Sequence, residues 1–279
     1  MHLRRFIAAA TQMPFAWASS PQEYFDRMHA PIAQAASLGA ELVVLPQLAG
    51  DMLVGVQVPT EPLASRAELA ARGGFSDWYA CVRRTAETTA QFYVHAFETL
   101  ARRYGLYLLP GTISLPGEGN GPLSDAAPPI FHAAFLFGPE GEVLGEQRQR
   151  LPSAGDDGAT GFGTALTPMD TPLGRIGVVV GDDALHTEVI RSAVAEGCNL
   201  VLNPSARRDS SASDTAITRW EMLWSNGIYV VESALAGGGF AGRAAIYGPR
   251  DRTAGTGGLM AQTPNDQGAD LVSLEIQLS

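Results

Sequence analysis

The stretch GRIGVVVGDDALHTEVIRSAVAEGCNLVLNP (residues 174–204) has the pattern of a strand, a helix and a second strand. The apolar run at 176–180 is short, β-branched and bounded by glycines, which is typical of a buried β-strand. A helical pattern follows and ends at Gly197, and a second apolar strand occupies 200–202. The turn at 181–183 lies at the carboxyl end of the first strand, where α/β folds usually place functional side chains. The apolar face of the helix is expected to comprise Leu185, Val189, Ala193 and Val194.

The rest of the chain alternates helical and strand patterns, with an antiparallel hairpin in the middle. Ser19 or Ser20 is a suitable N-cap for a helix that begins at Pro21. No repeat or linker divides the chain, so we predict a single α/β domain over residues 1–279. Segments rich in glycine and proline predict surface loops at 55–75, 115–129 and 153–164. The predicted helices are 21–38, 78–104 and 218–225, and the other predicted strands are 3–10, 41–45, 106–113, 130–137, 142–147, 228–233, 244–247, 258–262 and 271–276.

Charge and composition disfavour several classes of partner. The formal net charge is −10 and the isoelectric point is about 4.9, which disfavours binding to nucleic acid or to an anionic membrane. No apolar run approaches the ~20 residues that span a bilayer. The two cysteines, Cys81 and Cys198, do not make a disulfide framework, so we expect a cytoplasmic protein.

All nineteen basic residues are arginine, and the chain contains no lysine. Arginine stays protonated and cannot serve as a tunable amine, so catalysis by a lysine is excluded. The glycines at 237–239 lack the helix and the lysine of a phosphate-binding loop. His95 and His132 show no metal-ligand spacing. We therefore expect neither a metal nor another cofactor.

Four segments in order resemble the nitrilase superfamily, the carbon-nitrogen hydrolases. They are GAELVVLPQLAG (39–50), LFGPEGEVLGEQRQR (136–150), GRIGVVVGDD (174–183) and GRAAIYGPRDR (242–252). Each is weak alone, but together they cover nearly the whole chain. The resemblance implies the family's α-β-β-α sandwich, in which two sheets face each other between outer helices. It also implies pairing of the chains into homodimers or higher oligomers.

The family hydrolyses amides and nitriles with a cysteine nucleophile, a glutamate base and a lysine. Carrying these roles over by position places Gln47 at the base, Gln149 at the lysine and Gly181 at the nucleophile. An amide side chain does not accept a proton at neutral pH, and glycine has no side chain. Losing the nucleophile alone costs on the order of a millionfold in rate. The family's covalent mechanism therefore cannot operate when the nucleophile, the base and the lysine are all replaced.

The neighbouring residues do not restore the missing roles. Arg148 and Arg150 are charged but lie one residue away from Gln149, so strand alternation directs them to the other face. The family's second glutamate falls near Ser114 or Leu115, neither of which is acidic. Cys81 and Cys198 have the surroundings of small buried hydrophobic residues and not of nucleophiles.

Three hypotheses follow for function. The favoured one is a pseudoenzyme that keeps a neutral, hydrogen-bonding pocket for a small amide-like ligand or a regulatory role. A second is a structural subunit of an oligomer. A third is an active amide hydrolase with its chemistry moved to Asp182, Asp183 and His186, with or without a metal, although Asp183 also suits a turn and helix N-cap. The candidate pocket residues are Gln47, Gln149, Gly181, Asp182, Asp183, His186 and Asn203.

Overall fold

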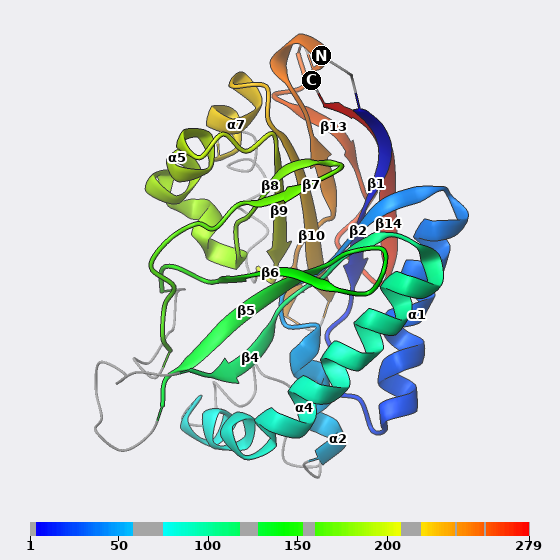
Figure 1. The fold of residues 1–279 in the computed structure, drawn as a ribbon, viewed down its shortest axis with the longest axis vertical. Helices are drawn as coiled ribbons and strands as arrows, with labels where there is room; N and C mark the ends of the chain where they lie inside the picture. Colours follow the sequence, from blue (N-terminus) through cyan, green and yellow to red (C-terminus); the bar gives the residue numbers. More distant parts are fainter. Residues whose placement is uncertain are drawn as a thin grey trace.

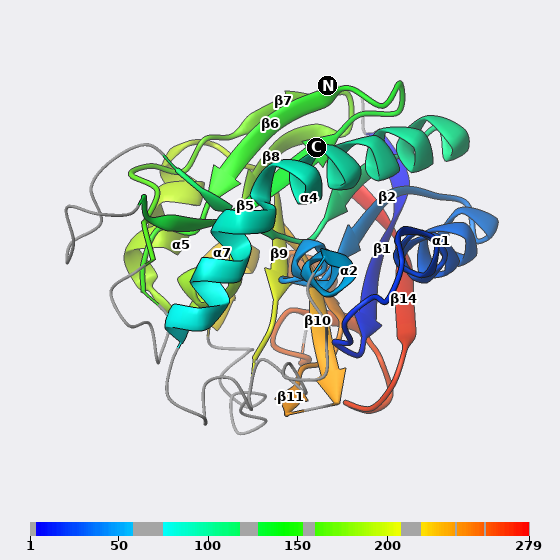
Figure 2. The ribbon, with the colours of Figure 1, turned by 90° about the horizontal axis from the view of Figure 1, so that it is seen from below.

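The strands of the computed structural model form one curled sheet whose two halves pack face to face (Figure 1). The first half has the order β4-β5-β3-β2-β1, with β6 added on β5 and β14 added on β1. The second half has the order β10-β9-β8-β7, with β11 and β12 added on β10 and β13 on β12. A short parallel pairing of β1 with β10 joins the halves, and Figure 2 shows β9, β10, β1 and β14 side by side. The residues described are 4–57, 75–117, 128–152, 160–207, 219–237, 239–253 and 255–278, so much of the three predicted surface loops lies outside them.

The elements of the first half alternate between strand and helix near the N-terminus and end in a hairpin. The strands are β1 (Arg4–Met13), β2 (Ala40–Leu45), β3 (Tyr107–Pro110), β4 (Ile113–Pro116), β5 (Ile130–Phe137), β6 (Val143–Arg148) and β14 (Asp270–Leu278). The helices are α1 (Pro21–Ser37), η1 (Gly50–Leu53), α2 (Val54–Gln57) and α4 (Phe75–Tyr104).

The second half is built on the strand–helix–strand unit predicted from the sequence. Its strands are β7 (Met169–Thr171), β8 (Gly174–Val178), β9 (Leu200–Ser205), β10 (Tyr229–Gly237), β11 (Phe240–Ala241), β12 (Ala245–Tyr247) and β13 (Leu259–Gln262). Its helices are η2 (Gly181–Leu185), α5 (Thr187–Ala195), α7 (Glu221–Ser225) and η4 (Arg250–Arg252).

Three apolar cores between these layers explain the sandwich. The first lies between α1, α4 and the first half of the sheet, and it contains Val43 of β2. The second lies between the two halves and contains Val44, the next residue of the same strand. The third lies between the second half and α5 and α7, and it contains Val230, whereas Val231 belongs to the second core. Successive strand side chains point to opposite faces, so buried strands apolar on both faces separate four layers.

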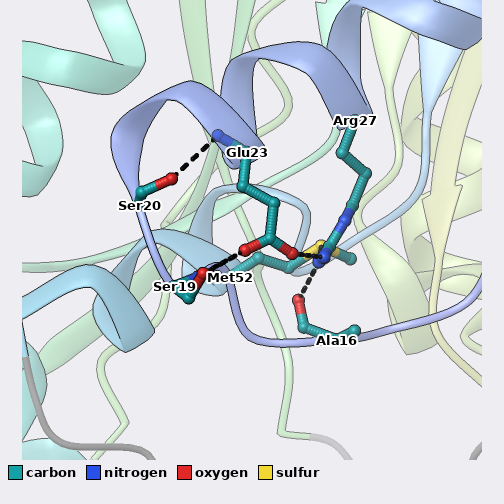
Figure 3. A network of polar contacts seen from close by, with 6 residues as sticks. All are labelled: Ala16, Ser19, Ser20, Glu23, Arg27 and Met52. Atoms are coloured by element: carbon teal, nitrogen blue, oxygen red, sulfur yellow. Dashed lines mark hydrogen bonds and ion pairs between the residues drawn. The ribbon is translucent and has the colours of Figure 1, made fainter.

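The start of α1 shows how local sequence fixes one of the outer helices (Figure 3). Ser20 is the N-cap, and its hydroxyl accepts a hydrogen bond from the backbone of Glu23 at 3.1 Å. The Glu23 carboxylate accepts from the hydroxyl and the backbone of Ser19 and pairs with Arg27. The Ser19 hydroxyl is the main reason why the pKa of Glu23 is lowered. This reciprocal pattern is a variant of the capping box, and it satisfies backbone groups that a helix start otherwise leaves open.

Several predicted boundaries differ from the structure for local reasons. The predicted strand 106–113 is two strands, β3 and β4, because Gly111 has a left-handed φ of 72° between them. A Cβ on Gly111 would lie 2.8 Å from the carbonyl carbon of Pro46, so the close approach also requires glycine. Leu185 was expected on the apolar helix face, but it lies in η2 and is 54% exposed. None of the described helices combines the length and the apolar character needed to cross a membrane.

Candidate functional site

Gln47, Gln149 and Gly181 come from three separate elements and meet in the buried interior. Gln47 follows β2, Gln149 follows β6, and Gly181 begins η2 after β8. Gln47 Nε2 donates a hydrogen bond to Gln149 Oε1 at 3.2 Å. A Cβ built on Gly181 would lie 2.7 Å from Cδ and Nε2 of Gln47 and still closer to its Oε1. The Gln47 amide therefore occupies the space that a side chain at position 181 would need.

The hydrogen bonds fix which way each glutamine amide points. Gln149 Nε2 donates to the backbone carbonyl of Leu151 at 2.8 Å, and a carbonyl only accepts, so Gln149 Oε1 faces Gln47. Gln47 must then present its nitrogen to Gln149. Gln47 Oε1 therefore faces Gly181 and has no hydrogen-bond donor among the described residues. The result is a neutral acceptor aimed at the position where the resemblance places the nucleophile.

Asn203 of β9 places a second amide group next to the backbone of Gly181. Its Nδ2 donates to the backbone carbonyls of Val179 and Gly181, the latter at 3.4 Å, which fixes the orientation of the amide. Its Oδ1 is buried and has no hydrogen-bond partner among the described residues. Buried polar atoms are nearly always hydrogen-bonded, so an unpaired oxygen marks a place where a donor is missing.

Asp183 serves the loop after β6 and caps neither helix. Its two carboxylate oxygens accept hydrogen bonds from the backbones of Arg150 and Leu151, at 2.8 and 2.9 Å. Burial raises the pKa of Asp183 to about 6, against the opposing effect of these two hydrogen bonds. The expected N-capping role is wrong, since the residue before α5 is His186 and no side chain caps that helix. Asp183 instead holds the Gln149 loop against η2.

The other two residues of the hypothetical relocated centre make no side-chain contact with Asp183 that would form an acid–base pair among the described residues. Asp182 is partly exposed, and His186 Nδ1 lies 3.9 Å from the Glu188 carboxylate at the start of α5. The one hydrogen bond between His186 and Asp183 in the described structure is backbone to backbone. Among the described residues, no group of three His, Cys, Asp or Glu side chains is placed to hold a metal ion.

The arginines on either side of Gln149 contact other residues, and Cys198 is buried. Arg148 pairs with Glu146 at 2.6 Å and stacks on the ring of Phe131. Arg150 Nη1 donates to the hydroxyl of Ser192 on α5 at 2.8 Å. Cys198 is buried, and burial raises the pKa of its thiol to about 11, which leaves little thiolate at neutral pH.

Two buried polar clusters were missed by the sequence reasoning. In the first, Asp51 accepts hydrogen bonds from the backbone and hydroxyl of Ser114, at 2.7 and 2.8 Å. The same hydroxyl lies 2.9 Å from His132 Nδ1. The family's second glutamate falls near Ser114, and the carboxylate that reaches Ser114 comes from Asp51, close to Gln47 in the chain. An isolated Asp in an apolar context, such as that in GDMLVG, was the available signal.

In the second cluster, Glu232 of β10 is surrounded by donors. Arg219 Nη2 lies 3.0 and 3.1 Å from its two oxygens, and Trp220 Nε1 donates to it at 3.1 Å. Arg207 Nη2 lies 3.6 Å from Glu232 Oε1. Glu232 pairs in register with Asn203 across β10 and β9, so the two side chains share one face of the sheet. A charged residue inside a predicted apolar strand was the signal for this cluster.

Comparison with known families and proteins identifies relatives over most of the chain. A family model described as carbon-nitrogen hydrolase matches residues 7–279. A bifunctional nitrilase/nitrile hydratase of Nicotiana tabacum is 27% identical over 189 residues, which are 65% of this chain and 48% of the relative. A similarly named protein of Lupinus angustifolius is 25% identical over 183 residues, with the same coverage. The chain spans about half the length of these curated relatives.

Solved structures of an amidase from Nesterenkonia sp. AN1 share the fold. A glutamate-to-glutamine mutant with acrylamide added to its active-site cysteine matches with a TM-score of 0.67 at 22% identity, over 96% of this chain and 92% of that chain. A double mutant in complex with acrylamide has a TM-score of 0.68 at 23% identity, over 98% and 90%. Identities this low show a common fold and nothing about activity.

Proposed function

The chain belongs to the carbon-nitrogen hydrolase family, and from this premise we propose that it is a non-hydrolytic member that binds a small primary amide beside Gly181. The observation that carries the proposal is the pair of amide oxygens that flank this glycine. Gln47 Oε1 and Asn203 Oδ1 both lack a donor among the described residues. A primary amide carries two N–H donors on one nitrogen, so a single ligand group complements both oxygens.

Hydrolysis by the family mechanism requires a nucleophile, a base and a positive group. We propose that Gln47, Gln149 and Gly181 occupy these three positions, and none of the three supplies the required chemistry. Because the glutamines are neutral and hydrogen-bonded to each other, they suit recognition of an uncharged polar group. Binding without turnover fits a sensor or regulatory subunit in the cytoplasm, and pairing of chains through the outer helices belongs to the same proposal.

The test compares acetamide with N,N-dimethylacetamide by isothermal titration calorimetry. Both have the same carbonyl, but only acetamide has N–H donors, so only acetamide is expected to bind. Replacing Gln47 by Leu removes one acceptor and is expected to weaken acetamide binding about tenfold. Gln22→Leu is the matched control, since Gln22 is exposed on α1 and bonds only to Asp26 in the described structure.

An ammonia-release assay with the same amides checks for turnover. No release above the buffer rate is expected. Release by the unmodified chain would overturn the proposal, and its loss in Asp183→Asn or His186→Ala, or with a chelator, would favour a relocated centre. Equal heats for acetamide and its dimethyl derivative would leave no role for the two oxygens and would favour a structural subunit.

A further inference from the structure

Arg207, Arg219 and Glu232 form a buried ionic cluster with one more positive than negative charge within the described residues. The exposed fractions of their side chains are 10%, 5% and 6%. A charge that is removed from water is stable only when it is paired and hydrogen-bonded. From this imbalance we propose that the cluster is a binding site for the carboxylate of a small ligand, which serves as the second anion.

Glu232 does not hydrogen-bond to both arginines. Its two oxygens already accept from Arg219 Nη2, and one of them also accepts from the indole of Trp220. Arg207 approaches only to 3.6 Å, beyond hydrogen-bond distance for a protein N–H donor. The guanidinium of Arg219 is further held over the Trp220 ring, 5.0 Å from its centre, so its plane is fixed. Arg219 is therefore held in place by Glu232 and Trp220, whereas Arg207 contacts Glu232 without a hydrogen bond.

Four buried guanidinium nitrogens have no hydrogen-bond partner among the described residues: Nε and Nη2 of Arg207, and Nε and Nη1 of Arg219. Nε and Nη2 of Arg207 form one edge of the planar guanidinium. That edge presents two parallel N–H groups at the spacing of the two oxygens of a carboxylate. A monoanion in this position neutralises the single excess charge and completes the bidentate pair.

The carboxylate site adjoins the proposed amide site. Glu232 and Asn203 are partners in register on β10 and β9 and lie on one face, and Asn203 reaches the carbonyl of Gly181. Arg219 also lines a cavity of approximately 560 Å³ between η2, α5 and α7, with Ala184, Leu185, Ile190 and Met222 among its walls. A ligand with a carboxylate and a primary amide a few bonds apart matches both sites. This choice of ligand rests on the proposed function, whereas the carboxylate site does not.

The test titrates acetate, acetamide and succinamate, the half-amide of succinate, into the full chain by calorimetry. Acetate probes the arginines alone, and acetamide probes Gln47 and Asn203 alone. Arg207→Gln leaves the bonds between Arg219 and Glu232 in place and is expected to weaken acetate binding about tenfold. Succinamate binding should weaken by the same factor, and acetamide binding should stay unchanged. Arg191→Gln on α5 is the matched control, because it removes an exposed arginine.

Glu232→Gln keeps the size of the side chain and one amide oxygen as an acceptor but removes the negative charge. It removes the competing anion, so acetate should bind about tenfold more tightly than to the unmodified chain, whereas a purely structural ion cluster predicts no gain. Acetate that binds neither the unmodified chain nor Glu232→Gln at 100-fold molar excess overturns the carboxylate site. Tighter binding of inorganic phosphate than of acetate overturns the assignment to a carboxylate. Acetate binding without acetamide binding would support the carboxylate site and overturn the proposed amide function. Acetamide binding without acetate binding would support the amide function and overturn the carboxylate site.

Discussion

The polar groups around Gly181 and those around Glu232 are linked through Asn203 and Glu232, which pair across β9 and β10, but the two sets satisfy their hydrogen bonds in different ways. Gln47 and Gln149 share a hydrogen bond, so around Gly181 only neutral amide oxygens are left without a donor among the described residues. Both Glu232 oxygens already accept hydrogen bonds, whereas four buried nitrogens of Arg207 and Arg219 have no hydrogen-bond partner among the described residues. Unpaired charge is far more costly to bury than an unpaired amide oxygen. The charged cluster therefore has the larger capacity to be stabilised by a ligand.

The largest effect is expected from Glu232→Ala. Removing the only carboxylate that contacts Arg207 and Arg219 within the described residues leaves two buried cations unpaired, which should lower the free energy of unfolding by about 3–5 kcal/mol. Urea unfolding measures the loss, and Glu188→Ala, at an exposed position on α5, should change it by no more than about 0.5 kcal/mol. Adding acetate should recover part of the stability. Equal losses of unfolding free energy in the two variants would show that the buried cluster stabilises the fold no more than an exposed charge does.

The next effect concerns Asp183, which borders the neutral site. Burial raises its folded-state pKa to about 6 from the ordinary value of 3.8, so between these values the folded chain holds a proton that the unfolded chain has released. Stability should therefore fall as pH rises through this window, by at most about 3 kcal/mol, and Asp183→Asn should lack this component. Urea unfolding at pH 4, 5, 6 and 7 gives the difference between the two curves. Parallel curves would show that Asp183 titrates normally.

The layered fold was predicted well from the sequence because it depends on the periodicity of apolar residues. The buried strands around Val44, Val201 and Val230 are apolar on both faces, and Ser20 marks the start of α1 by ordinary capping chemistry. The ends of strands were predicted less well. Gly111 divides one predicted strand in two because the chain passes close to Pro46, a contact distant in sequence.

The candidate site was only partly accessible to sequence reasoning, because its chemistry arises from contacts between distant segments. Carrying the family positions over singled out Gln47, Gln149 and Gly181, but not the direction in which each amide points. That direction follows from the carbonyl of Leu151, to which Gln149 donates. The pairing of Glu232 with Arg207 and Arg219 likewise depends on strand register, which no single segment specifies.

A smaller effect is expected from Gly181→Ala. Gly181 has a left-handed φ of 55°, and an added Cβ would displace the Gln47 amide, so the variant should lose about 2 kcal/mol of stability. Gly197→Ala is the matched control, because Gly197 has a φ of 71° but no atom within 4 Å of an added Cβ. The difference between the two variants isolates the contact with Gln47. Gln47→Ala combined with Gly181→Ala should abolish that difference, and its persistence would place the strain in the backbone alone.

The smallest effect tests whether Gln47 and Gln149 form a self-sufficient pair. Replacing either one by Leu leaves its partner short of one hydrogen bond and should cost about 1 kcal/mol, whereas the double replacement should cost less than the sum. A coupling energy of about 1 kcal/mol in this double-mutant cycle, measured by urea unfolding, is the expected outcome. The matched cycle of Arg219→Met with Glu232→Leu should give a larger coupling, since both partners there are charged and buried. If the two couplings were equal, the neutral and charged sites would not differ in their capacity to be stabilised by a ligand, and the preference for a carboxylate at the arginines would lose its energetic basis.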